Sequence, residues 1–106
     1  MENKILIDAI YIHSYGGKEL LEYLIVSIKK RGLLNKAVFF FDYRLNTEEN
    51  LLFNDCFFYK IKSRVSSRIS AYKNYSKNFN TIVCLSNIPP PYKILNKTVF
   101  IYFHNL

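Results

Sequence analysis

Two adjacent glycines followed by a lysine stand where a strongly apolar segment gives way to apolar residues at helical spacing. The stretch reads HSYGGKELLEYLI over residues 13–25, so Gly16, Gly17 and Lys18 fall at the predicted start of a helix. Glycine lacks a Cβ atom and lets a ligand oxygen approach the backbone, and the first N–H groups of a helix attract negative charge. The stretch therefore predicts an anion-binding site, above all for a phosphate. A tight turn between a strand and a helix would need the same residues.

The sequence lacks the better-defined motifs of nucleotide binding and hydrolysis. It contains neither the G-x-G-x-x-G fingerprint of dinucleotide binding nor the G-x-x-x-x-G-K-[ST] pattern of a P-loop, and no G-x-S-x-G nucleophile elbow. A zinc site built from His13, Cys56, Cys84 and His104 would have no recognisable ligand spacing. We therefore expect no metal and no other bound cofactor.

Two histidines could take part in chemistry near the anion site. His104 stands at the carboxyl end of the last predicted strand, at the edge of the sheet where the glycines are expected. There it could act on a hydroxyl group or bind a phosphate. His13, at the end of the first predicted strand, has the same options with less support. A lone histidine is more often a surface or packing residue than a functional one, and both interpretations stay open for these two.

Apolar runs divide the chain into strands and helices. The first helix should end at Gly32, because glycine caps helices and the preceding cluster Lys29–Arg31 favours the negative end of the helix dipole. A second amphipathic helix is expected between Ile61 and Phe79. The predicted strands are Lys4–Ile12, Ala37–Arg44, a segment around Cys56–Lys60, Thr81–Ser86 and Lys97–Asn105.

The order of these elements predicts one α/β domain over residues 1–106. Short loops and the order β-α-β-β-α-β-β are typical of an open, doubly wound, mostly parallel sheet of about five strands, a Rossmann-like fold with two main helices. Pro89–Pro91 should form a stiff corner after the fourth strand, because proline cannot continue a sheet or a helix. The last strand should lie at an edge of the sheet, where its VFIYF segment favours a homo-oligomer.

Charge is distributed unevenly along the chain. Up to Asp55 there are eight acids against seven Lys and Arg residues, a net charge of −1, and after it eight cations with no acid, a net charge of +8. Such a field favours phosphates, nucleic acid or anionic lipid, although a composition set by an AT-rich genome would also explain it. We expect four of these cations on the outer face of the second helix: Arg64, Arg68, Lys73 and Lys77.

The cysteines and the first apolar segment indicate in which cellular compartment the protein resides. Cys56 and Cys84 stand in apolar surroundings without CxxC spacing, which predicts buried, reduced thiols. The apolar run Ile5–Ile12 is too short to span a bilayer and lacks the basic leader and cleavage site of a signal peptide. We therefore expect a cytoplasmic protein.

Three stretches in this order carry a family resemblance: ILIDAIYIHSYGGKELLEYLI, VCLSNIPPP and VFIYFHN. Together they resemble the amino-terminal half of bacterial glycosyltransferases with the GT-B fold, of the retaining family-four type, and the likeness covers essentially the whole chain. It implies that Gly16 and Gly17 face the diphosphate of a nucleotide-sugar donor, where Lys18 adds its charge to the helix-terminal amides. It also implies that His104 lies near the reacting hydroxyl, and that Asn87 and the prolines after it help to shape the side of a glycan or lipid-linked acceptor. Asn105 is a further expected substrate-binding residue.

The resemblance also implies what this chain lacks. In that family the nucleotide-sugar pocket, with its paired glutamates, belongs to a carboxyl-terminal domain that these residues do not contain. We therefore expect the chain to be inactive in sugar transfer by itself. The family's membrane-associated members suggest that the basic second helix contacts the inner face of the membrane.

A different class of function remains open beside the enzyme. The basic second half could make the chain a stand-alone binding module for nucleic acid or anionic lipid. The sequence offers no RNP-like pattern and no helix-turn-helix pattern in support of it.

Overall fold

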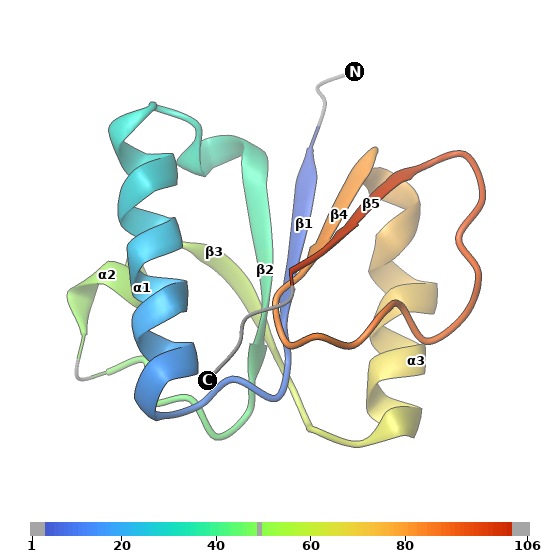
Figure 1. The fold of residues 1–106 in the computed structure, drawn as a ribbon, viewed down its shortest axis with the longest axis horizontal. Helices are drawn as coiled ribbons and strands as arrows, with labels where there is room; N and C mark the ends of the chain where they lie inside the picture. The colour runs from blue at the N-terminus through green and yellow to red at the C-terminus, as the bar shows by residue number, and fades with distance from the viewer. Residues whose placement is uncertain (1–3, 49, 103–106) are drawn as a thin grey trace.

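The computed structural model describes residues 4–48 and 50–102 as an open α/β sheet with helices on both faces (Figure 1). All neighbouring strands are parallel, in the order β3-β2-β1-β4-β5. The predicted Rossmann-like fold is confirmed, and the sheet is entirely rather than mostly parallel. The strands are β1 Ile5–Ala9, β2 Ala37–Asp42, β3 Phe57–Ile61, β4 Thr81–Cys84 and β5 Thr98–Ile101.

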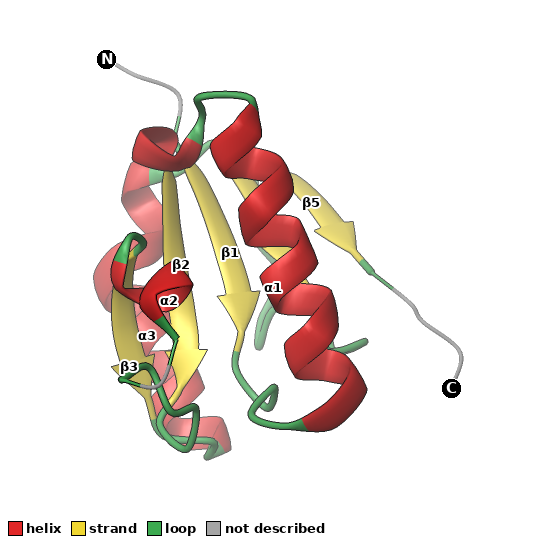
Figure 2. Ribbon diagram, turned by 90° about the vertical axis from the view of Figure 1, so that its left-hand side faces the viewer, coloured by secondary structure: helices red, strands yellow, loops and turns green. Residues whose placement is uncertain are grey.

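Two helices cover opposite faces of the sheet. α1, Tyr15–Lys30, lies on one face and α3, Val65–Tyr75, on the other, as Figures 1 and 2 show. Short 3-10 turns at Leu34–Lys36 and Ser76–Asn78 lead into β2 and β4. Each helix packs on its own cluster of buried residues, so the sheet is the middle layer of two cores.

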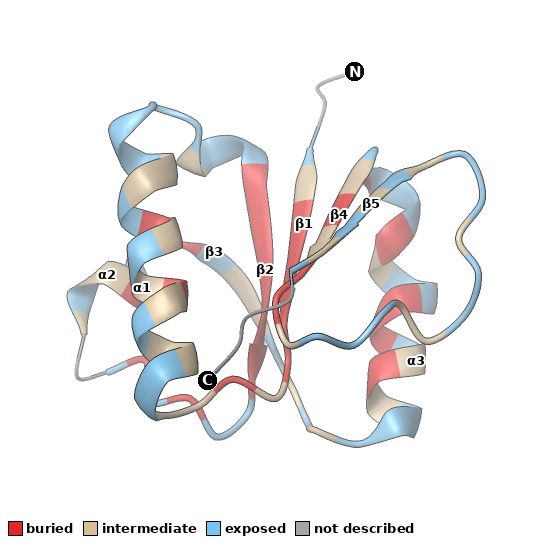
Figure 3. Cartoon of the chain, viewed as in Figure 1, coloured by how far each residue is buried: buried red, intermediate tan, exposed pale blue. Residues whose placement is uncertain are grey.

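β2 is the strand on which both cores depend, and all six of its residues are buried (Figure 3). Phe39 and Phe41 belong to the core beneath α1, whereas Phe40 belongs to the core beneath α3. This follows from the alternation of side chains along a strand. The benzyl group of Phe40 meets the rings of Tyr72 and Tyr75 edge-on, at centroid distances of 5.7 and 6.0 Å.

The carboxyl end of α1 follows from local sequence. Gly32, at φ 70°, takes the left-handed conformation that ends the helix, and its N–H donates to the carbonyl of Lys29 at 3.0 Å. The N–H of Leu33 donates to the carbonyl of Ile28 at 3.1 Å. The predicted glycine cap is therefore confirmed.

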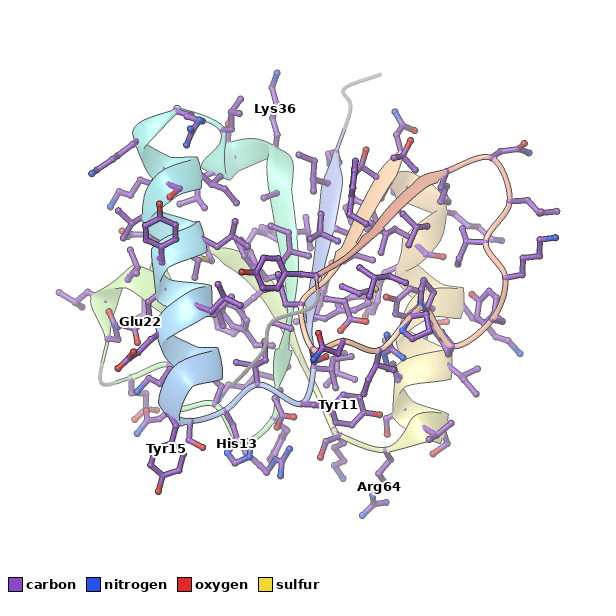
Figure 4. All side chains as sticks on the ribbon, in the orientation of Figure 1. Tyr11, His13, Tyr15, Glu22, Lys36 and Arg64 are labelled. Carbon is purple, nitrogen blue, oxygen red and sulfur yellow. The ribbon has the colours of Figure 1, made fainter. Side chains whose placement is uncertain are left out.

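A short helix, α2 Leu51–Asn54, precedes β3 and was not predicted from the sequence. Asn50 begins it by accepting a hydrogen bond from the N–H of Leu52 at 2.9 Å. The side-chain amide of Asn50 also donates to the Glu22 carboxylate of α1 at 2.8 Å. Glu22 lies on the side of α1 that faces α2 (Figure 4).

Arg68 is not on the outer face of α3, and the sequence-based expectation for it was wrong. Arg68 is only 4% exposed. Its Nε and Nη2 atoms donate to Oδ2 of the buried Asp8 carboxylate at 3.0 and 2.9 Å. The Tyr72 hydroxyl donates to the same oxygen at 2.6 Å. Burial and the neighbouring carboxylate raise the pKa of Tyr72, so the phenol keeps the proton that it donates. The three other cations are exposed as predicted, although α3 is shorter than expected: Lys73 lies in it, Arg64 just before it and Lys77 in the 3-10 turn after it.

Cys56 and Cys84 are buried and free of disulfides, as predicted. Burial raises the pKa of the Cys56 thiol to about 12, with a smaller contribution from Asp55, and it also raises the pKa of Cys84. None of the helices in the described residues has the length and apolar character needed to cross a membrane. β5 lies at an edge of the sheet as expected, and self-association through it stays a prediction.

Replacing Arg68 by Met should destabilise the protein strongly. The substitution leaves Asp8 as a buried carboxylate without its cationic partner, which costs about 3–5 kcal/mol. Urea unfolding followed by circular dichroism measures the change in the free energy of unfolding.

The matched control is Arg64→Met, which removes an exposed arginine from the start of the same helix and should change stability by no more than about 0.5 kcal/mol. The double variant Asp8→Asn/Arg68→Met should lose less than the sum of the two single changes, because neither charge is then stranded. Equal, small effects of Arg68→Met and Arg64→Met would contradict the role given to the ion pair.

Candidate anion-binding site

The candidate site lies at the carboxyl edge of the sheet, between the loops that follow β1 and β4. The chain leaves these adjacent strands in opposite directions, and such a switch point is where open α/β sheets bind ligands. A hollow of about 270 Å³ is found there. Its lining residues are Tyr11, Ile12, His13, Ser14, Gly17 and Ser86.

Ser86 joins the two loops that form this hollow. Its Oγ donates to the carbonyl of Ile10 at 2.8 Å, and the N–H of Leu85 donates to the carbonyl of Asp8 at 3.0 Å. The loop after β4 is thus bonded to the loop after β1. The two loops form one continuous rim.

Gly16 and Gly17 both belong to the first turn of α1, which begins at Tyr15. Neither has a positive φ, so the left-handed conformations of this connection are supplied by two tyrosines, Tyr11 at φ 81° and Tyr15 at φ 57°. A Cβ atom on Gly17 would lie 3.4 Å from the Ile12 side chain, at the tight end of ordinary van der Waals contact, so helix and loop are close together here. Gly16 is exposed and Gly17 half-buried.

The start of α1 has unusually little to neutralise its positive end. Ser14 is the N-cap residue in an extended conformation, yet its side chain makes no capping hydrogen bond, and the first turn contains no acid. Lys18, half-buried in the same turn, adds a positive charge. Backbone N–H groups and a cation at one place are what a phosphate or carboxylate ligand requires.

Asp42, at the end of β2, fixes the backbone of the site. Its carboxylate is completely buried and accepts the Tyr11 N–H at 2.7 Å, which holds Tyr11 in its left-handed conformation. The same carboxylate accepts the N–H of Arg44 at 2.9 Å and two side-chain bonds from that arginine, at 2.9 and 3.0 Å. Asp8 acts similarly one strand away, where Oδ1 accepts the N–H of Ile10 at 3.0 Å.

The electrostatics of Asp42 reflect these bonds. Burial alone would raise the pKa of this carboxyl group, but hydrogen bonds from the Arg44 side chain and from the Arg44 and Tyr11 N–H groups, with the Arg44 charge, outweigh it. The pKa of Asp42 is therefore held below its usual value of 3.8. The site loop rests on a permanently ionised group at neutral pH.

The strained backbone of the described residues gathers at this edge. Four non-glycine residues have positive φ, and three of them lie at this edge: Tyr11 and Asn87 in the loops after β1 and β4, and Tyr15 as the first residue of α1. Such conformations persist where the surrounding structure imposes them, and they are common at functional sites. In Figure 4, Tyr11, His13 and Tyr15 follow one another along the rim where the strands end.

Some of the site residues predicted from the sequence lie at or beside the hollow, and others lie outside the described residues. Gly17 lines the hollow, and Gly16 and Lys18 belong to the same helical turn. Asn87 is exposed and follows Ser86 on the rim, with Arg68 Nη2 donating to the carbonyl of the next residue, Ile88, at 3.2 Å. His104 and Asn105 lie outside the described residues.

Sequence reasoning missed or undervalued several residues of the site. His13 received less weight than His104, yet it is half-buried and lines the hollow. Asp42 and Ser86 were not considered at all. A signal for Asp42 exists in AVFFFD, where an acid directly ends a continuously apolar strand. Within the described part of the chain, no group of three or more His, Cys, Asp or Glu side chains is placed to hold a metal ion.

Comparison of the chain with models of protein families, with curated proteins and with solved structures gives no match.

The substitution Asp42→Asn should destabilise the protein at neutral pH by about 1–3 kcal/mol, because it removes the charge that satisfies buried N–H donors. A lowered folded-state pKa means that this stabilisation is present above the usual carboxyl range and is lost as the pH falls below about 4. The difference in unfolding free energy between the wild type and the variant should therefore shrink in acid. Urea unfolding at a series of pH values measures it.

Asp55→Asn is the control, since Asp55 is half-exposed and pairs with the exposed Lys29 at 2.7 Å. Its effect should stay below about 1 kcal/mol. A penalty for Asp42→Asn that does not change between pH 7 and pH 3 would contradict the assigned ionisation.

Proposed function

We propose that the carboxyl edge of the sheet binds the diphosphate of a nucleotide-sugar donor, and that the chain acts as the acceptor-side domain of a glycosyltransferase. The observation that carries the proposal is the hollow at the switch point, bounded by a helix start without a side-chain cap or an acid. The resemblance in the three ordered sequence stretches supplies the class of enzyme.

The size of the hollow favours a phosphate end over a whole nucleotide. Pockets that enclose a complete small ligand measure roughly 300–1,000 Å³. The hollow of about 270 Å³ is just below that range and is open along the rim. It suits one or two phosphate groups, with the sugar and base held elsewhere, and this fits a donor shared between two domains.

Different groups of the rim would contribute differently to such a ligand. The first N–H groups of α1 donate to phosphate oxygens. The positive charge of Lys18 offsets the negative charge of the phosphate. His13 lines the hollow and offers a further donor. The Ser86 hydroxyl already donates to the Ile10 carbonyl, so it shapes the rim rather than binding the anion.

The carboxylates near the rim are not available for acid–base chemistry. Asp8 binds Arg68 and Tyr72, and Asp42 binds Arg44 and the Tyr11 N–H. Both therefore hold the backbone in place. In the proposed function this chain binds and orients the donor phosphates, and the remaining catalytic groups come from a second domain.

Two substitutions of the N-cap residue Ser14 distinguish the effect of an added charge on anion binding from the effect of a change in helix capping. Ser14→Asp and Ser14→Asn both keep a residue that caps helices well, so both should fold at least as stably as the wild type. The aspartate places a negative charge where the ligand phosphate would lie. We expect it to weaken binding of inorganic pyrophosphate and of uridine diphosphate at least tenfold, whereas Ser14→Asn should stay within about threefold. Isothermal titration calorimetry measures both affinities.

Chemical shift changes on adding pyrophosphate should be centred on residues 13–18. Equal affinities of the aspartate and asparagine variants, or shift changes centred on α3, would refute the anion site. The enzymatic part is tested by sugar transfer from a nucleotide sugar, using the full product of the reading frame that encodes this chain. Ser14→Asp should lower kcat/KM at least tenfold and Ser14→Asn should not.

A further inference from the structure

Two grooves with basic walls flank α3, away from the proposed anion site. The first, of about 390 Å³, runs between α3 and the end of β3 and is lined by Lys60, Lys62 and Tyr75 among others. The second, of about 550 Å³, lies between the end of α3 and the segment 92–95. Lys73, Lys77, Lys93 and Tyr92 contribute to its walls.

The cations of these grooves are not neutralised within the described residues. Six exposed cations surround α3, and none of them forms an ion pair with a described carboxylate. The buried Arg68 uses its charge on Asp8, and Lys97 donates to the backbone carbonyl of Phe79. The field on this side of the molecule is therefore positive and open to solvent. The six are Lys60, Lys62, Arg64, Lys73, Lys77 and Lys93.

Each groove also contains one tyrosine ring that packs against a second tyrosine. Tyr75 in the first groove stacks on Tyr59, with centroids 4.2 Å apart and planes 16° from parallel. Tyr92 in the second groove is 38% exposed and meets Tyr72 edge-on at 6.3 Å. Aromatic rings beside a basic groove are the combination on which the bases of single-stranded nucleic acid stack.

The outer face of α3 argues against a membrane as the partner. Val65, at its start, is the one apolar residue among the exposed residues of α3. The others, Ser66, Ser70, Lys73 and Asn74, are polar. A helix that lies in a bilayer interface needs bulky apolar side chains on the buried face. Serine and asparagine side chains are instead suited to hydrogen bonds with phosphate and sugar oxygens.

We propose that the two grooves beside α3 bind single-stranded nucleic acid, with lysines on its phosphates and bases against Tyr75 and Tyr92. Arg64, at the start of α3, extends the basic surface to the carboxyl edge (Figure 4). The proposal stands apart from the diphosphate site, which uses the opposite helix α1 and a different hollow.

Fluorescence anisotropy with a labelled 20-nucleotide oligothymidine measures binding by the full chain at several salt concentrations. If four phosphates are contacted, the affinity should fall roughly 50-fold between 50 and 200 mM salt, since each contact on a single strand contributes about −0.7 to the slope of log K against log salt. The variants Lys60→Gln/Lys62→Gln and Lys73→Gln/Lys77→Gln should each reduce the magnitude of that slope by about 1.4.

The control for net charge is Lys30→Gln/Lys36→Gln. Both lysines are exposed and precede β2, and Lys36 lies at the opposite end of the molecule from Arg64 (Figure 4). This variant loses the same charge and should keep the wild-type slope. Tyr92→Leu should weaken binding roughly tenfold through lost stacking, with its fold checked by circular dichroism.

Three results would overturn the proposal. The first is no binding of the oligonucleotide at 50 mM salt. The second is an equal loss of slope in the control and groove variants with no effect of Tyr92→Leu, which would mean a general attraction between opposite charges. The third is groove-dependent binding to vesicles containing phosphatidylserine without binding to the oligonucleotide, which would identify a lipid surface.

Discussion

The ion pair between Asp8 and Arg68 connects the parts of this protein that define its fold and its candidate site. Asp8 lies next to the last residue of the central strand, Arg68 comes from the amino-terminal half of α3, and the two are 60 residues apart in sequence. Tyr72 and the Ile10 N–H complete the bonds of the carboxylate, and Arg68 also reaches the carbonyl of Ile88. A single buried charge pair thus joins the sheet, one helix and two loops. Such a pair tolerates the loss of neither partner.

The strands and helix ends could be predicted because their causes are local. A strand buried on both faces reads as a continuous apolar run, as in the phenylalanines of β2, and Gly32 ends α1 through its own conformation. Arg68 was misplaced because of its residue type. Its spacing, four residues before the buried Tyr72, puts it on the inner side of α3, but its charge favoured the outer face. Its partner Asp8 lies in a distant strand, which local patterns do not reveal. α2 was missed for a related reason, since its four residues depend on Asn50 and on a contact with Glu22.

The candidate site shows the same division between local and distant causes. A strand that passes into a glycine-containing helix start locates the carboxyl edge, so Gly17 and Lys18 could be found from the sequence. The left-handed conformation of Tyr11 could not, because tyrosine has no preference for it and the Asp42 carboxylate imposes it from the next strand. Ser86 is bonded to Ile10 across 76 residues, a distance that periodicity cannot bridge.

Two hydrogen bonds affect the entropy of ligand binding at the rim: the one that the Tyr11 N–H donates to Asp42, and the one that Ser86 donates to the Ile10 carbonyl. These bonds already order the loops in the folded protein, so the loops lose little further conformational entropy when a ligand binds. Binding should then resemble docking onto a rigid template, with affinity that depends on electrostatic match more than on loop rearrangement. Evolution could change the selectivity of such a rim by altering a single side chain, without redesigning the backbone beneath it.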